Sequence, residues 1–246
     1  MIKAAIQKFL NSRGFEIIRF SVGFSPQELA ILNKVKPFTA SNAERVTGLI
    51  NAVKYLVANK IEGDFLECGV WRGGSMMAAM LTLLKLGDTS RHFYLFDTYE
   101  GMTPPTEKDV THTGTRAADL LASAERREGP TYWCIASLED VQRNVFSTGY
   151  PQDKIHFIKG RVEDTLPTQA PKHIALLRLD TDWYESTYHE LLHLYPLLRP
   201  NGVLIIDDYG YWQGSRRAVD EYFAALKHLP LLNKLDHSGR LVVKPA

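Results

Sequence analysis

Residues 174–182, IALLRLDTD, and residues 202–208, GVLIIDD, are two apolar runs that each end in a pair of aspartates. Short apolar runs bounded by polar residues are typical of buried strands. A helical segment separates the two runs, so we expect two parallel neighbouring strands joined by a helix. The carboxyl ends of parallel strands meet at one edge of a sheet, where open α/β sheets bind their ligands. Four carboxylates are therefore expected together at this edge, namely Asp180, Asp182, Asp207 and Asp208.

Four carboxylates at one edge repel one another unless a cation or close pairing offsets their charge. Magnesium prefers oxygen ligands and usually keeps several waters. We therefore expect Asp180, Asp207 and Asp208 to bind Mg²⁺, and Asp182 to act as the base that takes the proton of a substrate hydroxyl. The alternative is that the aspartates cap helices or pair with arginines, namely Arg178, Arg216 and Arg217.

A second informative stretch lies upstream of the aspartates. Residues 64–75 predict a short strand, a glycine-bearing turn and the start of a helix, and residues 92–97 predict a strand that ends in Asp97. This β-α-β arrangement is typical of the nucleoside-binding half of a sheet. The glycines, Gly69, Gly73 and Gly74, let backbone amides approach a ligand closely. Their spacing fits neither the dinucleotide fingerprint nor the phosphate loop.

Two acids flank this turn and indicate the kind of ligand. Glu67 precedes the glycines, where a carboxylate would repel a pyrophosphate but would suit an ammonium or sulfonium group. Asp97 is placed to accept hydrogen bonds from ribose hydroxyls. A nucleoside with a cationic amino-acid tail satisfies both acids, and S-adenosylmethionine is such a ligand. The alternative is a tight turn with a capping aspartate and no ligand.

The remaining segments complete one doubly wound α/β domain with a mostly parallel sheet. Apolar residues at helical spacing predict a helix over residues 42–60, and further helices are predicted over 76–86, 137–146 and 215–226. A third strand is expected at residues 155–160, and two terminal apolar runs predict an antiparallel hairpin. The loosely patterned stretch between residues 98 and 131, with a helix over 117–127, is typical of a lid, a binding loop or a disordered tether.

Composition excludes several classes of protein. The 29 basic and 28 acidic side chains nearly balance, so no bulk field favours nucleic acid. No apolar run is long enough to span a membrane. Cys68 and Cys134 match no metal or redox spacing, which indicates a reducing cytoplasm and two small core residues. The basic and apolar first twenty residues predict either a packing helix or a helix that lies on a membrane or partner.

Four blocks of the sequence carry a resemblance to a known family. They resemble the signature blocks of the macrocin O-methyltransferase (TylF) family, whose members are sugar and phenol O-methyltransferases of antibiotic biosynthesis that use S-adenosylmethionine and magnesium. The resemblance extends from about residue 38 to the C-terminus. The blocks are GDFLECGVWRGGS at 63–75, FDTYEGM at 96–102, LRLDTDWYEST at 177–187 and IDDYG at 206–210.

The resemblance implies a class I methyltransferase, Rossmann-like fold over residues 42–246, with residues 1–41 as an N-terminal helical extension or lid. It also implies that Asp180, Asp207 and Asp208 bind the metal and that Asp182 is the base. The stretch from Thr103 to Arg127 would act as a lid, together with the region of Thr39. The implied cofactor-binding residues are Thr39, Glu67, Gly69, Trp71, Arg72, Gly73, Ser75, Asp97, Tyr99, Gly101, Val162, Glu163 and Asp180, with Val162 and Glu163 near the adenine by analogy with catechol-type methyltransferases.

Two other functions remain open at this point. A metal-dependent glycosyltransferase could use Asp180 and Asp182 to chelate manganese on a nucleotide sugar, but that function gives no reason for Glu67. A non-catalytic nucleoside-binding protein would use the acids as caps. The acceptor of a methyltransferase would be a small molecule with a sugar or phenol hydroxyl, and the lids and N-terminal helices could form a homo-oligomer interface.

Overall fold

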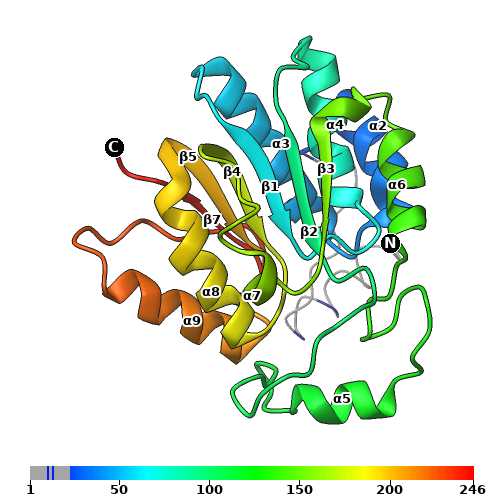
Figure 1. Cartoon of the computed structure of the whole chain (residues 1–246), viewed down its shortest axis with the longest axis vertical. Coiled ribbons are helices and arrows are strands. Elements are labelled where there is room, and N and C mark those ends of the chain that lie inside the picture. The colour runs from blue at the N-terminus through cyan, green and yellow to red at the C-terminus, as the bar shows by residue number, and fades with distance from the viewer. Residues whose placement is uncertain (1–9, 11–12, 14–22) are drawn as a thin grey trace.

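The structure, a computed structural model, describes residues 10, 13 and 23–246. Its centre is a seven-stranded sheet in the order β3-β2-β1-β4-β5-β7-β6 (Figure 1). The parallel strands are β1 (Asp64–Cys68), β2 (Phe93–Asp97), β3 (Ile155–Lys159), β4 (Ile174–Leu179) and β5 (Leu198–Ile206). The two apolar runs that end in aspartates, β4 and β5, are neighbours, as predicted. The predicted C-terminal hairpin is also confirmed, because β7 (Arg240–Val243) is antiparallel to both β5 and β6 (Asn233–Lys234).

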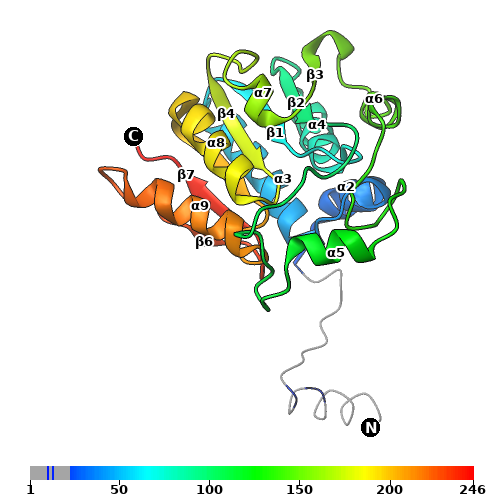
Figure 2. The same ribbon diagram turned by 60° about the horizontal axis from the view of Figure 1, so that its bottom comes forward.

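Helices cover both faces of the sheet, which confirms the doubly wound α/β class. One face carries α2 (Pro26–Val35), α3 (Ala43–Ala58), α4 (Gly74–Leu86) and α6 (Leu138–Phe146), and the other carries α7 (Val162–Thr165), α8 (Tyr184–Leu194) and α9 (Gln213–Ala224). Short 3-10 turns occur at η1 (Lys36–Phe38), η2 (Gln152–Lys154) and η3 (Tyr195–Leu197). Figures 1 and 2 show α5 (Ala117–Ser123) set apart from both layers.

The core consists of two apolar clusters, one on each side of the sheet. Phe65, Ile50 and Met76 belong to the cluster under α2, α3, α4 and α6. Leu177 and Leu191 belong to the cluster under α8 and α9. All six residues of β4 are buried, as expected for a parallel strand with helices on both sides. This buried strand carries one charged residue, Arg178, into the centre of the molecule.

The chain before α3 packs on the same core as the rest of the domain. In α2, Ser25 and Glu28 form a capping box, and Ile31 and Val35 are buried against α3 and α4. The predicted boundary between residues 41 and 42 stays a prediction. The expectation for the first twenty residues falls outside the described residues, apart from Leu10 and Arg13. Among the residues that the structure describes, no helix is long and apolar enough to cross a membrane.

Candidate active site

A cavity of about 790 Å³ lies at the carboxyl edge of the sheet, under α5 and its flanking loops. Three residues of the predicted site do not line this cavity: Glu67, Gly73 and Tyr99. The other predicted residues line it together, namely Thr39, Gly69, Trp71, Arg72, Ser75, Asp97, Gly101, Val162, Glu163, Asp180, Asp182, Asp207 and Asp208. Residues far apart in the sequence therefore meet at one edge, as the strand order requires.

Asp97 holds together the two turns at the end of β1 and β2. Its Oδ2 accepts hydrogen bonds from the backbone amides of Val70 (2.6 Å) and Trp71 (3.0 Å), and its Oδ1 accepts one from the amide of Tyr99 (2.7 Å). Burial raises the pKa of Asp97 despite these bonds. Gly69 is required beside them, because its φ is +81° and a Cβ there would lie 2.0 Å from the carbonyl oxygen of Asp180.

The three predicted residues that do not line the cavity support its wall. Glu67 is almost fully buried, and its Oε1 accepts a hydrogen bond from Arg178 Nη1 at 2.6 Å, while its Oε2 has no partner among the described residues. Burial raises the pKa of Glu67 to about 7. Tyr99 is buried and donates its hydroxyl to the carbonyl of Leu95. A Cβ on Gly73 would lie 2.8 Å from Val145 of α6.

The aspartates that follow β4 and β5 form a cluster that could hold a metal ion. Asp180, Asp207 and Asp208 each offer an oxygen, and these oxygens lie within 4.8 Å of one another. Burial and the charges of neighbouring carboxylates raise the pKa of Asp208 well above its usual value, and burial does the same for Asp180 despite the nearby Arg178. An oxygen-only donor set with surplus negative charge fits a hard divalent cation such as Mg²⁺.

Two arginines already pair with part of this cluster. Arg178 donates to Asp180 at 2.5 Å and to Asp207, and Arg45 donates to the other oxygen of Asp207. The expectation that arginines pair with the aspartates is therefore met by Arg178. Arg216 and Arg217 instead pair within α9, with Asp220 and Glu221 respectively. Asp208 forms no ion pair with an arginine in the described part of the chain, and its side chain instead shares a hydrogen bond with Asp182.

Asp182 stands beside the cluster in an unusual backbone conformation. Its φ is +68°, in the left-handed region that non-glycine residues seldom adopt. Burial raises its pKa to about 7, against a hydrogen bond shared with Asp208 and with support from the charge of Asp180. A carboxylate with a pKa near the operating pH is well matched to general-base work.

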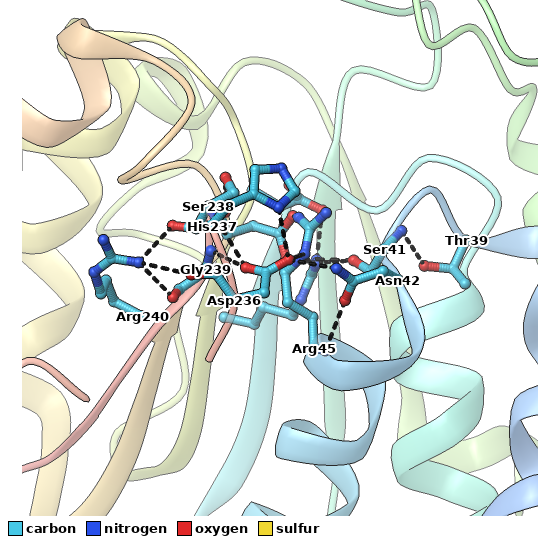
Figure 3. Close-up of polar contacts among 12 residues, drawn as sticks. Thr39, Ser41, Asn42, Arg45, Asp236, His237, Ser238, Gly239 and Arg240 are labelled. Carbon is cyan, nitrogen blue, oxygen red and sulfur yellow. Dashed lines mark hydrogen bonds and ion pairs between the residues drawn. The ribbon is translucent and has the colours of Figure 1, made fainter. Parts of the chain in front are cut away.

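The C-terminal turn, residues 236–239, makes polar contacts with the start of α3, which sequence reasoning missed (Figure 3). Two of its residues, His237 and Ser238, line the cavity. Asp236 accepts hydrogen bonds from Asn42 Nδ2 at 2.6 Å and forms an ion pair with Arg45 Nε at 3.0 Å. Ser238 donates its hydroxyl to the carbonyl of Asp207 at 2.6 Å. Arg45 thus links the start of α3, the C-terminal turn and the aspartate cluster. The sequence predicts a helix start at residues 42–45 and a hairpin turn at residues 236–239. No local pattern indicates that these two segments are in contact.

The segment from β2 to α6 forms the roof of the cavity. Met102, Leu121 and Tyr132 line it from this side, and Trp183 and Trp212 pack edge-to-face at 4.9 Å beneath α5. The roof is largely apolar. Cys134 also lines the cavity and is only half-buried, so the expectation of a core position is met by Cys68 alone.

The chain is similar to known proteins over most of its length. Residues 35–242 match the family described as Macrocin-O-methyltransferase (TylF). The chain is 33% identical over 201 residues to an 8-demethyl-8-(2,3-dimethoxy-alpha-L-rhamnosyl)-tetracenomycin-C 4'-O-methyltransferase of Streptomyces olivaceus, covering 82% of this chain and 73% of the relative. It is 35% identical over 184 residues to the mycinamicin III 3''-O-methyltransferase of Micromonospora griseorubida, covering 75% and 69% respectively.

A solved structure is similar over nearly the whole chain. The O-methyltransferase NovP aligns with a TM-score of 0.72 and 25% sequence identity, covering 89% of this chain and 100% of that one.

Proposed function

This chain belongs to the macrocin O-methyltransferase (TylF) family of S-adenosylmethionine-dependent O-methyltransferases, and we propose that it methylates a sugar or phenol hydroxyl with the help of Mg²⁺. The likeness to NovP confirms the expected class I methyltransferase fold. One observation carries the finer proposal: Asp182 lines the same cavity as the three clustered aspartates and as Asp97. A base, a metal-ligand set and a nucleoside site at one sheet edge suit methyl transfer to an alcohol.

The cofactor-binding residues are proposed from the walls of the cavity. S-adenosylmethionine supplies a methyl group on a positively charged sulfur. Asp97, fixed by three backbone amides, would accept hydrogen bonds from its ribose hydroxyls. Val162 and Glu163, which line the cavity after β3, would lie near the adenine. Glu67 lies behind this wall, where it is paired with Arg178, so attraction for a cationic ligand would come from the carboxylates that line the cavity, such as Asp97.

The metal ligands and the base have separate tasks. Asp180, Asp207 and Asp208 would hold Mg²⁺, which when bound lowers the pKa of an acceptor hydroxyl beside it. Asp207 would share its charge with Arg45 and Arg178, which orient it from behind. Asp182 accepts the proton of the acceptor hydroxyl as the oxygen–methyl bond forms and the carbon–sulfur bond breaks.

The lining of the cavity supports an uncharged acceptor. Three lining arginines are already paired, Arg45 with Asp207, Arg72 with Asp140 and Arg161 with Glu163. The roof offers apolar and aromatic side chains instead of free cations. A diphosphate would therefore find few unpaired partners, which argues against the nucleotide-sugar chemistry of a glycosyltransferase. One relative is named for 4'-O-methylation of a rhamnosyl tetracenomycin and another for 3''-O-methylation of mycinamicin III, and a glycosylated natural product is proposed as the acceptor here.

The proposal can be tested by thermal shift and by transfer of a labelled methyl group. S-adenosylmethionine is expected to raise the melting temperature, and label is expected to reach uncharged glycosides or phenols in the presence of Mg²⁺ but not of chelator. Stabilisation by a nucleotide sugar with Mn²⁺ instead would favour a glycosyltransferase. Full transfer in chelator would contradict the metal role.

A further inference from the structure

The lid segment, residues 98–137, is the part of the chain that forms the roof of the cavity. Hydrogen bonds join it to both loops that carry the aspartates. Trp183, next to Asp182, donates its indole N–H to the carbonyl of Thr103 at 3.0 Å. On the other side, the amide of Gln213 donates to the carbonyl of Val110 at 2.8 Å, after the loop that carries Asp207 and Asp208. The lid segment is therefore not an independent flap, because these hydrogen bonds hold it against the loops beneath it.

One buried carboxylate stands at the centre of these contacts. Asp109 has no exposed surface. Its Oδ1 accepts a hydrogen bond from the backbone amide of Tyr184 at 2.8 Å, and its Oδ2 accepts bonds from the amide (2.7 Å) and hydroxyl (2.9 Å) of Thr106. Its carbonyl accepts the amide of Ala117, the first residue of α5. Asp109 thus joins the lid turn, α5 and α8.

The bond to Tyr184 supplies what α8 lacks. The N-cap residue of α8 is Trp183, which makes no side-chain capping bond. The first amides of a helix need acceptors from outside the helix, and a negative charge near them is favourable. Asp109, 75 residues away in the sequence, provides both. The cap of the helix that follows the catalytic loop is therefore a side chain of the lid.

The position of Asp182 depends on the same short segment. Asp182 lies two residues before Tyr184 and has a φ of +68°. Such a conformation in a non-glycine residue persists only where the surroundings hold it. The lid holds the two residues that follow, Trp183 through Thr103 and Tyr184 through Asp109.

Gly214 leaves the space that this carboxylate occupies. A Cβ on Gly214, near the start of α9, would lie 2.2 Å from Asp109 Oδ1 and 3.2 Å from the amide nitrogen of Tyr184. Glycine in a helix is otherwise unfavourable by about 1 kcal/mol relative to alanine. Its absence of a side chain is thus accounted for by the fit of Asp109 between α8 and α9.

We propose that Asp109 is a positioning residue that couples closure of the lid to the placement of Asp182, by capping α8 from the lid. This inference rests on the proposed function, in which Asp182 is the base. Breaking the Asp109 contacts should move the base away from the acceptor hydroxyl while leaving the opposite, nucleoside side of the cavity in place.

Two substitutions test the hydrogen bond between Asp109 and the amide of Tyr184, one at the acceptor and one at the glycine packed against it. Asp109→Ala removes the carboxylate, and Gly214→Ala pushes it away without altering its chemistry. We expect each to lower kcat by about 10- to 100-fold, with the Kd for S-adenosylmethionine changed by less than about threefold. Asp109→Asn, which keeps one oxygen acceptor, should lie between these variants and the wild type. Glu125→Ala, which removes an exposed ion pair with Arg127 inside the lid segment and touches neither α8 nor the cavity, is the matched control and should leave kcat unchanged.

Turnover is expressed per cofactor-binding site, from the stoichiometry of the cofactor titration, so that misfolded protein does not count as slow enzyme. Hydrogen exchange reports on the contact between Asp109 and α8 independently of methyl transfer. Asp109→Ala and Gly214→Ala should each speed exchange in peptides that cover residues 103–117 and 183–186, and Glu125→Ala should not. A chain that methylates no acceptor would count against the proposed function alone, since the exchange still decides whether Asp109 ties the lid to α8. Unchanged exchange in both variants, or faster exchange with wild-type kcat, would overturn the inference.

Discussion

The aspartates that follow β4 and β5 are buried or half-buried, and burial disfavours their charged form. Burial raises the pKa of Asp180, Asp182 and Asp208, and only part of their charge is met by an arginine. A protein tolerates such a cluster where a ligand supplies the missing charge, which is why perturbed carboxylates gather at functional sites. The proposed division of labour in the cluster rests on position, because Asp182 adjoins the three aspartates whose oxygens could hold a metal ion and is not one of them.

The role of Asp182 gives the sharpest prediction for a single side chain. Asp182→Asn keeps the shape of the residue but removes the base, so we expect kcat to fall by about 10²- to 10⁴-fold with the affinity for S-adenosylmethionine retained. Radiolabelled methyl transfer and calorimetric titration of the cofactor measure the two quantities. Asp164→Asn, an exposed carboxylate of α7 outside the cavity, is the control. A kcat within a few fold of the wild type would mean that another group takes the proton.

The aspartates of the candidate site were easier to predict from the sequence than the arginines that pair with them. Asp180 and Asp207 follow apolar runs that predict strands, so their meeting at the edge follows from parallel pairing. Arg178 lies inside one of those runs, and it was named only as a partner of the aspartates. Its bond to Glu67 depends on the pairing of β4 with β1. Arg45 meets Asp207 across 162 residues, and no periodicity encodes such a contact.

At the scale of elements, the turn between η1 and α3 forms one wall of the cavity by close packing. Gly74, at the start of α4, lets the backbone of Phe38 approach, since a Cβ at residue 74 would lie 2.5 Å from the carbonyl oxygen of Phe38 and 2.7 Å from Cβ of Thr39. Thr39 lines the cavity as a consequence.

Replacement of this glycine should therefore displace a wall of the cofactor site. Gly74→Ala is expected to cost about 1–3 kcal/mol in unfolding free energy through overpacking and to weaken cofactor binding. Gly48→Ala is the matched control, because its Cβ would meet only the end of the flexible Leu235 side chain and no backbone atom. Urea denaturation and cofactor titration compare the two. Equal stability and affinity in both variants would show that the packing at Phe38 does not shape the site.

The contact between α6 and the glycine turn should give a pH-dependent stability. Arg72 forms an ion pair with Asp140 at 2.8 Å, and its hydrogen bond is the main reason that the pKa of Asp140 is lowered to about 2. Since the unfolded value is about 3.9, this stabilisation is fully present above about pH 4 and is lost as the pH falls through about 2.

Asp140→Asn should therefore be less stable than the wild type at pH 7, and the gap in unfolding free energy should shrink by about half at pH 3. Urea denaturation at both pH values measures it. Asp119→Asn, which breaks an exposed ion pair with Arg116, should produce little difference at either pH. A gap for Asp140→Asn that is equally large at pH 7 and pH 3 would refute the assignment of the shifted carboxyl.

The elements themselves were mostly predictable, and the lid helix shows where tertiary contacts intervene. The pattern predicts a helix over residues 117–127, but α5 ends at Ser123. Ala124 has extended backbone angles and its carbonyl accepts a bond from the Trp133 indole at 3.3 Å. A contact within the lid thus takes the place of the next helical turn, and such contacts are invisible to helical periodicity.

At the scale of the whole molecule, the sheet brings the loops that follow its five parallel strands to one edge, and the rest of the chain covers them. The neighbouring positions of β4 and β5 were predicted, because two parallel strands joined by a helix commonly lie side by side. The contacts that cover the site from outside the sheet were not predicted, because the lid and the C-terminal turn reach it through single side chains such as Asp109 and Asp236. Function on this scaffold therefore depends on two segments that the fold class does not specify.

The central claim is that the aspartates at this edge bind a divalent cation. Isothermal titration calorimetry of Mg²⁺ into protein saturated with S-adenosylhomocysteine tests it without any acceptor. The account predicts one ion per chain in the wild type and binding weakened by more than about tenfold in Asp208→Asn, with Asp164→Asn unchanged. A wild-type chain that binds no Mg²⁺, or an Asp208→Asn variant that binds it equally well, would contradict the account.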